Sequence, residues 1–267
     1  MSQGTPGKND NTARAFDWRK DSPNPGKFKR MSAVPVLHFQ HSMLLLFPYQ
    51  IEAFFPIRPI ANWIIIGICV LLWVLGAAGK LSDEFIVSLV LYEWSPLDLI
   101  GHCFLHADFF HLLGNMVFLW VFGNAICSNT NNLVYPLLFL LFGAVAGAIE
   151  LLFSPESGED GVIGASGAVN GVIGFALAVY PKDKVEMFFL FFIKPSTFSV
   201  SLWVLVLFWL GFDLWGVLTH GSGIAYWAHM GGLATGLVTG MIFDRMDWVN
   251  VTEWDKGTIL DLFSRRE

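Results

Sequence analysis

The sequence predicts an all-α polytopic membrane protein, built as a bundle of six transmembrane helices. Hydrophobic residues make up 54% of its 267 residues and charged residues only 14%, a balance that soluble domains of this size rarely show. A membrane-spanning helix needs about 20 predominantly apolar residues. Six stretches approach that requirement: 61–79, 109–127, 133–153, 164–181, 199–219 and 224–243.

The first 60 residues precede these spans. Residues 1–40 are polar and rich in Gly, Pro and Asn, so we expect a flexible tail without a cleaved secretory signal. Residues 41–60 are expected to lie at the membrane interface, because their apolar run is interrupted by Pro48 and Glu52. A second apolar run, 187–193, is too short to cross and is expected there too.

The six spans would form one domain over residues 61–243, followed by a polar C-terminal tail over residues 244–267. With six spans, 15 of the 16 Lys and Arg residues fall on the side that holds both termini, and only Lys80 falls on the other. The positive-inside rule therefore predicts that both termini are cytoplasmic. We expect a bacterial inner (plasma) membrane.

A serine and a histidine stand at the heads of two separate spans. Ser166 lies in Gly164-Ala165-Ser166-Gly167 and His229 lies in Ala228-His229-Met230-Gly231-Gly232. A serine hydroxyl becomes a nucleophile when a neutral imidazole can take its proton. The alternative is that Ser166 only packs a helix crossing, as small residues commonly do in membranes.

Glycines favour the first interpretation, because they would let the fourth and sixth spans approach closely. They recur at four-residue spacing on both spans, at Gly167 and Gly171 and at Gly232, Gly236 and Gly240. With both termini cytoplasmic, spans two, four and six all begin at the outer face. Polar residues from three stretches of the chain would then meet at one depth.

His111 and Asn115 are four residues apart at the head of the second span, so they share one helix face. Together with the Ser166 backbone N–H they could stabilise an oxyanion. Alternatively, the pair forms an interhelical hydrogen bond that only holds the bundle together.

His102, His106 and His111 could instead bind a metal, since histidines four apart on a helix can hold zinc. No H-E-x-x-H arrangement accompanies them, so we expect no metal. No other cofactor is expected. His102 and His106 are expected to tie down the loop before the second span.

Two carboxylates fall within predicted spans. Asp213 lies in the outer half of the fifth span, where it could orient a histidine or reach the interface. We favour a structural or solvated role for it. Glu150 is near the outer end of the third span and is expected to be interfacial.

Three motifs together resemble the rhomboid intramembrane serine proteases, across about 185 residues. They are His102-x3-His106-x4-His111-x3-Asn115, Gly164-Ala-Ser166-Gly167 and Ala228-His229-Met-Gly-Gly232-x3-Gly236. The resemblance implies a six-helix bundle with a water-filled cavity that opens to the outer face. It also implies that Ser166 and His229 act as a dyad without an aspartate, with His111, Asn115 and Ser166 in the oxyanion hole.

The sequence departs from the family pattern at two places. Leu97 and Asp98 stand where many members have Trp-Arg, and Asn170 stands where some have a tyrosine that stacks on the catalytic histidine. Neither change removes a reacting group.

The resemblance implies a serine endopeptidase that cleaves transmembrane substrate proteins in the lipid bilayer, with no nucleic acid partner. Three alternatives remain open: a non-catalytic binder of membrane proteins, a transporter or channel, and a metal-dependent membrane protease built on the three histidines.

Overall fold

The structure is a computed structural model that describes residues 44–154, 157, 161–191, 194–221, 223–252 and 255–263. The expected N-terminal tail, residues 1–40, and the last four residues of the C-terminal tail lie outside these ranges. Expectations about them are therefore still predictions.

A helix covers each of the six stretches predicted to span the membrane. The second is continuous through three segments, because α6 runs into a π-helical turn, η2, and then into α7. The helices are α3 (Ile60–Ala77), α6 (Phe109–Phe118), η2 (Leu119–Gly123), α7 (Asn124–Thr130), α8 (Val134–Phe153), α10 (Ser166–Val179), α11 (Leu202–Leu218) and α12 (Tyr226–Arg245). Short helices occupy the connections: α4 (Asp83–Val87), α5 (Pro96–Gly101), η1 (His102–Phe104) and α13 (Ile259–Phe263).

Three helices in the described part of the chain are long and apolar enough to cross a membrane: 60–77, 109–130 and 134–153. The helix α10 has 14 residues, and at 1.5 Å per residue it extends about 21 Å, less than a bilayer core of about 30 Å. A helix of this length can begin below the membrane surface. The number of membrane crossings remains a prediction.

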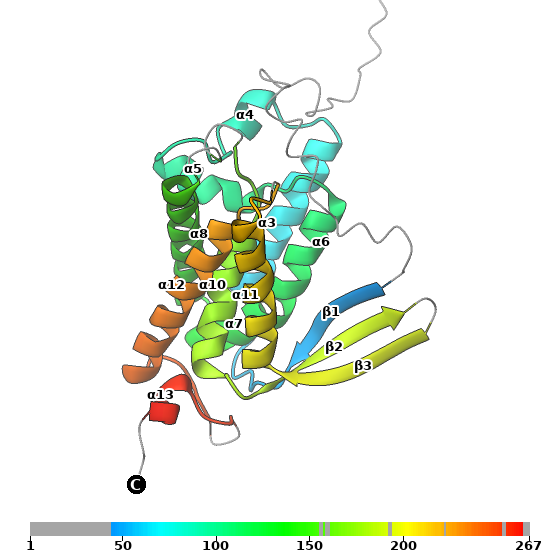
Figure 1. The fold of residues 1–267 in the computed structure, drawn as a ribbon. Helices are drawn as coiled ribbons and strands as arrows, with labels where there is room; N and C mark the ends of the chain where they lie inside the picture. Colours follow the sequence, from blue (N-terminus) through cyan, green and yellow to red (C-terminus); the bar gives the residue numbers. More distant parts are fainter. Residues whose placement is uncertain are drawn as a thin grey trace, which may run out of the picture.

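The expectation of an all-α fold is wrong for the two segments expected at the interface. They belong to an antiparallel sheet in the order β1-β2-β3, with β1 at Leu44–Ile51, β2 at Lys184–Phe191 and β3 at Lys194–Ser201. The sheet extends to one side of the helices, near α6 (Figure 1). At the start of β2, Val185 and Met187 are buried between less buried neighbours, which is the two-residue period of a strand.

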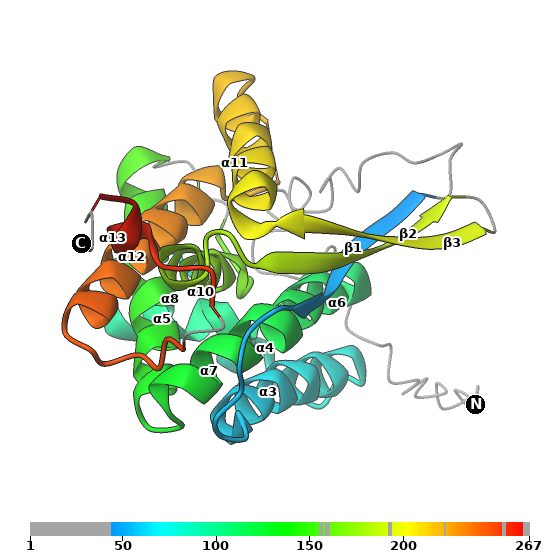
Figure 2. The ribbon, with the colours of Figure 1, turned by 90° about the horizontal axis from the view of Figure 1, so that it is seen from below.

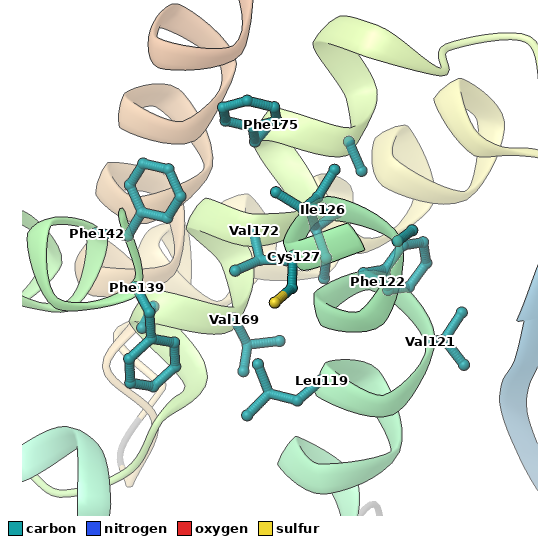
Figure 3. Packing of buried hydrophobic residues seen from close by; sticks show 14 of the residues in the cluster. Leu119, Val121, Phe122, Ile126, Cys127, Phe139, Phe142, Val169, Val172 and Phe175 are labelled. Carbon is teal, nitrogen blue, oxygen red and sulfur yellow. The ribbon is translucent and has the colours of Figure 1, made fainter. Parts of the chain in front are cut away.

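The centre of the molecule is α10, which contacts α8, α12 and η2. In Figure 2 the view along the bundle shows α10 among the other helices and the sheet projecting away from them. Figure 3 shows Val169 and Val172 of α10 between aromatic side chains of α8, including Phe139, and Leu119 of η2. Burying this central helix fixes the position of its first residue, Ser166.

The contact between α10 and α12 depends on glycines. A Cβ atom on Gly232 would collide with the backbone carbonyl of Gly167, and one on Gly236 would collide with the carbonyl of Gly171. The two backbones thus approach as closely as the glycine spacing in the sequence suggests. Because the obstacles are backbone atoms, side-chain rearrangement cannot relieve such a collision.

A buried polar network fixes α3 against the π-helical turn. The Asn62 side-chain amide donates to the Leu119 carbonyl and to Asn124 Oδ1, each at 2.8 Å, and Tyr135 donates its hydroxyl to Asn62 Oδ1 at 2.7 Å. The Leu119 carbonyl also accepts the backbone N–H of Asn124, so Asn62 adds a second donor to it and ties α3 to the π-helical turn.

The described part of the C-terminal segment packs against the bundle instead of extending as a free tail. After α12 the chain returns so that the Asn250 amide groups donate to the carbonyl of Asn129. Further on, Thr258 is buried and α13 contacts α10 and α12. This return brings Lys256 beside Asp183, at the end of α10 opposite Ser166.

Candidate active site

Ser166 and His229 lie within hydrogen-bonding distance of each other. The Ser166 Oγ atom is 2.9 Å from His229 Nε2. Ser166 is the first residue of α10 and His229 lies in the first turn of α12, so the close approach of these helices brings the two side chains together. Both side chains are only partly buried, so water can reach them.

The turn before Ser166 requires glycine. Gly164 has a φ of +128°, which residues with a Cβ atom rarely adopt. A Cβ atom there would also come within 2.6 Å of the His111 ring. The Gly164 N–H donates to the carbonyl of His102 at 2.9 Å. The loop before α6 and the turn before α10 therefore hold each other in place.

Glu150 holds the start of α12, a role that its position in the sequence does not predict. Its carboxylate is 2% exposed, accepts the Ala228 backbone N–H at 2.8 Å and accepts the Ser157 hydroxyl at 2.6 Å. The expectation that Glu150 is interfacial is therefore wrong: it is a buried partner for one of the free N–H groups at a helix start. This bond adjoins His229 in sequence.

Asp213 of α11 reaches the other nitrogen of the same histidine. Its Oδ1 atom is 2.9 Å from His229 Nδ1, and the side chains of Asp213 and His229 are 15% and 17% exposed. From its sequence position Asp213 could orient a histidine, although a structural or solvated role is the one expected. The structure brings it to the candidate base.

The two candidate oxyanion donors lie nearby but have different surroundings. Asp108 caps α6 by accepting the backbone N–H groups of Phe110 and His111, which sets the start of the helix. The His111 ring lies against Gly164, and its Nδ1 atom has no hydrogen-bond partner among the described residues. The Asn115 amide donates to the His111 carbonyl at 3.1 Å.

His102 and His106 are both buried in the loop that precedes α6. His102 Nδ1 is 2.9 Å from the Asp98 carbonyl, and the His106 ring packs edge-on against the His111 ring at 5.2 Å between centroids. Burial lowers the pKa of His102 to about 4 and the pKa of His106 to about 3. Both rings are therefore neutral at neutral pH.

A metal site receives no support from this arrangement. Within the ranges that the structure describes, no group of three or more His, Cys, Asp and Glu side chains is placed to hold a metal ion.

Asp98 and Asn170, which depart from the family pattern, each form hydrogen bonds with neighbouring backbone groups. The Asp98 carboxylate accepts the backbone N–H groups of Tyr92 and Glu93, so it fixes the loop that precedes α5. Asn170 donates its side-chain amide to the Ser166 carbonyl at 3.0 Å. Both residues thus stabilise segments beside the site, and the hydrogen bonds of the His229 ring within the described residues go to Asp213 and Ser166 instead.

Comparison with known proteins identifies the family. The Rhomboid domain profile matches residues 93–245. The chain is 28% identical over 173 residues to Rhomboid protein 1, mitochondrial, of Saccharomyces cerevisiae, covering 63% of this chain and 48% of that protein. It is 26% identical over 189 residues to Rhomboid protease GlpG of Haemophilus influenzae, covering 68% of this chain and 90% of that protein.

A third relative, Rhomboid protease GlpG of Klebsiella pneumoniae, is 25% identical over 188 residues, with 68% of this chain and 62% of that protein covered. The chain spans about half the length of the yeast relative and of the Arabidopsis thaliana protein RHOMBOID-like protein 12, mitochondrial. The Rhomboid domain match covers more than half of the 267 residues and includes all the site residues named above. The chain therefore belongs to the rhomboid family of integral membrane proteins.

Proposed function

We propose that this protein is an intramembrane serine endopeptidase that hydrolyses peptide bonds in or near the transmembrane segments of substrate proteins. The observation that carries the proposal is the 2.9 Å distance between Ser166 Oγ and His229 Nε2. A serine hydroxyl in this contact can transfer its proton to the ring as it attacks a carbonyl. The names of the two GlpG relatives support a protease.

The reaction would proceed through an acyl-enzyme. As Ser166 attacks, His229 accepts its proton and then donates it to the leaving amine, and water subsequently hydrolyses the ester. The oxyanion would be stabilised by the Ser166 backbone N–H at the positive end of α10, with His111 and Asn115 as further donors. Asn115 would have to exchange its present bond to the His111 carbonyl for one to substrate.

The membrane placement belongs to the same proposal. The Lys and Arg distribution supports cytoplasmic termini, which puts Ser166 toward the outer face and lets water enter there. A substrate helix would have to unwind locally, because its carbonyl groups are hydrogen-bonded in an intact helix. We propose a bacterial inner membrane as the location, with transmembrane proteins as partners.

Labelling with a fluorophosphonate probe tests the proposal. The full chain in detergent should react, and Ser166→Ala and His229→Ala should both abolish labelling, whereas a chelator should not. Ser88→Ala, which removes an exposed hydroxyl at the end of the short helix α4, is the matched control and should label normally.

Well-folded wild-type protein that resists the probe, and does not cleave a transmembrane substrate, would favour the non-catalytic binder. Cleavage that a chelator abolishes, without labelling, would favour the metal-dependent alternative.

A further inference from the structure

Three side chains from three helices are joined by two successive hydrogen-bonding contacts at the site. His229 of α12 contacts Ser166 of α10 through Nε2 and Asp213 of α11 through Nδ1, each at 2.9 Å. The family resemblance implies a serine and histidine alone, so the carboxylate is an additional feature of this chain.

The position of Asp213 follows from a second contact between α11 and α12. A Cβ atom on Gly216 would collide with the Tyr226 ring, so the two helices pack ring against glycine at this point. Asp213 precedes Gly216 by three residues, and His229 follows Tyr226 by three. When two antiparallel helices touch at one pair of residues, residues that lie three positions before it on one helix and three positions after it on the other also come together. The Gly216 contact therefore sets the register for Asp213.

The chemistry of the imidazole decides which atom donates in the bond between His229 and Asp213. His229 can accept the Ser166 proton only if Nε2 is unprotonated, so the proton of the neutral ring must reside on Nδ1. A carboxylate facing Nδ1 accepts that proton in a hydrogen bond and favours this tautomer. Its negative charge also stabilises the imidazolium that forms when Ser166 attacks.

We propose that Asp213 is a positioning residue that holds His229 in the tautomer required by Ser166 and stabilises its protonated form. This inference rests on the proposed peptidase function. Asp213 acts through His229 and contacts no reacting atom of the substrate. The competing explanation is that the bond only joins α11 to α12.

Other titratable groups lie near Asp213 and His229 and must be kept unchanged in the test. Tyr226 of α12 interacts electrostatically with Asp213, and His111 of α6 interacts electrostatically with His229. Glu150 of α8 binds the backbone at Ala228. None of these residues changes in the variants chosen.

The test compares Asp213→Asn with wild type by the second-order rate of fluorophosphonate labelling between about pH 5 and 9. We expect the rate at pH 7 to fall about 10- to 1,000-fold, below the roughly 10,000-fold effect of a fully buried triad aspartate because water can reach this one. The acid limb of the profile should move to lower pH, since the imidazolium loses its negative neighbour.

The matched control is Asp247→Asn, which removes one carboxylate from an exposed position beyond the other end of α12. It should leave the rate and the acid limb unchanged. A normal rate and an unmoved acid limb in Asp213→Asn would overturn the inference, as would a lower rate with an unmoved limb, which a merely structural bond predicts. Absence of labelling in wild type would instead reject the proposed function.

A measurement on the wild-type protein keeps the inference testable if Asp213→Asn does not fold. Nitrogen NMR of histidine-labelled protein, with the His229 signal assigned by its loss in His229→Ala, reports the tautomer. We expect the neutral ring to carry its proton on Nδ1. A proton on Nε2 would overturn the inference.

Discussion

Near each end of α10 a carboxylate lies beside a basic side chain, but the surroundings of the two carboxylates differ. At the Ser166 end, Asp213 has a 2.9 Å bond to His229 and is 15% exposed. At the other end, Asp183 is 3% exposed, its nearest cation is Lys256 Nζ at 4.0 Å, and its Oδ2 atom has no hydrogen-bond partner among the described residues.

Asp183 and Asp213 differ both in burial and in the partner that each carboxylate faces, and these differences should decide what each contributes. Burial raises the pKa of Asp183 to about 6, because a charged carboxylate is poorly stabilised there. The Asp213 carboxylate has a short bond to an imidazole and partial access to water, which suit it to assist a proton transfer. We expect Asp183 to influence stability and Asp213 to influence reactivity.

The largest effect should come from a substitution that forces α10 and α12 apart. Gly236→Val would place side-chain atoms against the backbone carbonyl of Gly171, forcing α10 and α12 apart. A displacement of about 1 Å can cost about 100-fold in rate, and overpacking typically costs about 1 to 3 kcal/mol. Labelling rate and thermal midpoint should both fall.

Gly67→Ala is the control for that experiment, since a Cβ atom on Gly67 of α3 would meet no atom within 4 Å. It should stabilise the helix by about 0.5 to 1 kcal/mol and leave labelling unchanged. A Gly236→Val protein that labels normally would show that the glycine contact does not set the distance between Ser166 and His229.

Substitution of Glu150 should have a smaller effect, because it disturbs only the end of α10 that holds Ser166. Glu150→Ala would leave the Ala228 N–H without its buried acceptor, at a cost of about 1 to 3 kcal/mol. Glu150→Gln keeps a carbonyl acceptor of nearly the same shape and should retain most stability. Thermal unfolding and labelling rates of both variants measure this difference.

Exposed Glu84 on α4 provides the control, and Glu84→Ala should change neither quantity. Equal losses in Glu150→Gln and Glu150→Ala would mean that the charge, and not the hydrogen bond to Ala228, holds the start of α12.

The sequence predicts the helices and the Ser166 and His229 pair for separate physical reasons. Apolar runs of sufficient length locate the helices, and small residues around a hydroxyl and an imidazole point to a close, polar crossing. The glycine spacing on 164–181 and 224–243 identifies which two spans meet. These signals are local to each span, so a single sequence contains them.

The sheet and the two carboxylate contacts depend on pairings that no local pattern specifies. The alternation from Lys184 to Met187 is a strand signal, but it covers only four residues and continues into an apolar run. Its partner, β1, lies about 140 residues earlier. Likewise, the bonds of Glu150 and Asp213 exist only because α8 and α11 both pack against α12 near its start.

The smallest predicted effect concerns Asp183, at the end of α10 away from Ser166. Its pKa is about 6 in the folded protein, against an ordinary value of 3.8, so between these values the folded state binds more protons than the unfolded state. Stability contributed by this group is therefore lost as pH rises from about 4 to above 6. Asp183→Asn cannot ionise and should escape that loss.

The thermal midpoints of the wild type and Asp183→Asn should thus be similar below about pH 4, where the carboxyl group is mostly protonated in both the folded and the unfolded state. Near pH 7.5 the variant should be more stable by on the order of 1 to 2 kcal/mol, with unchanged labelling because Ser166 lies at the opposite end of α10. Glu52→Gln removes the neighbouring exposed bond to Lys256 and should cost less than about 1 kcal/mol. If Asp183→Asn is instead less stable than wild type near pH 7.5, the attraction between Asp183 and Lys256 outweighs the cost of burying the carboxylate.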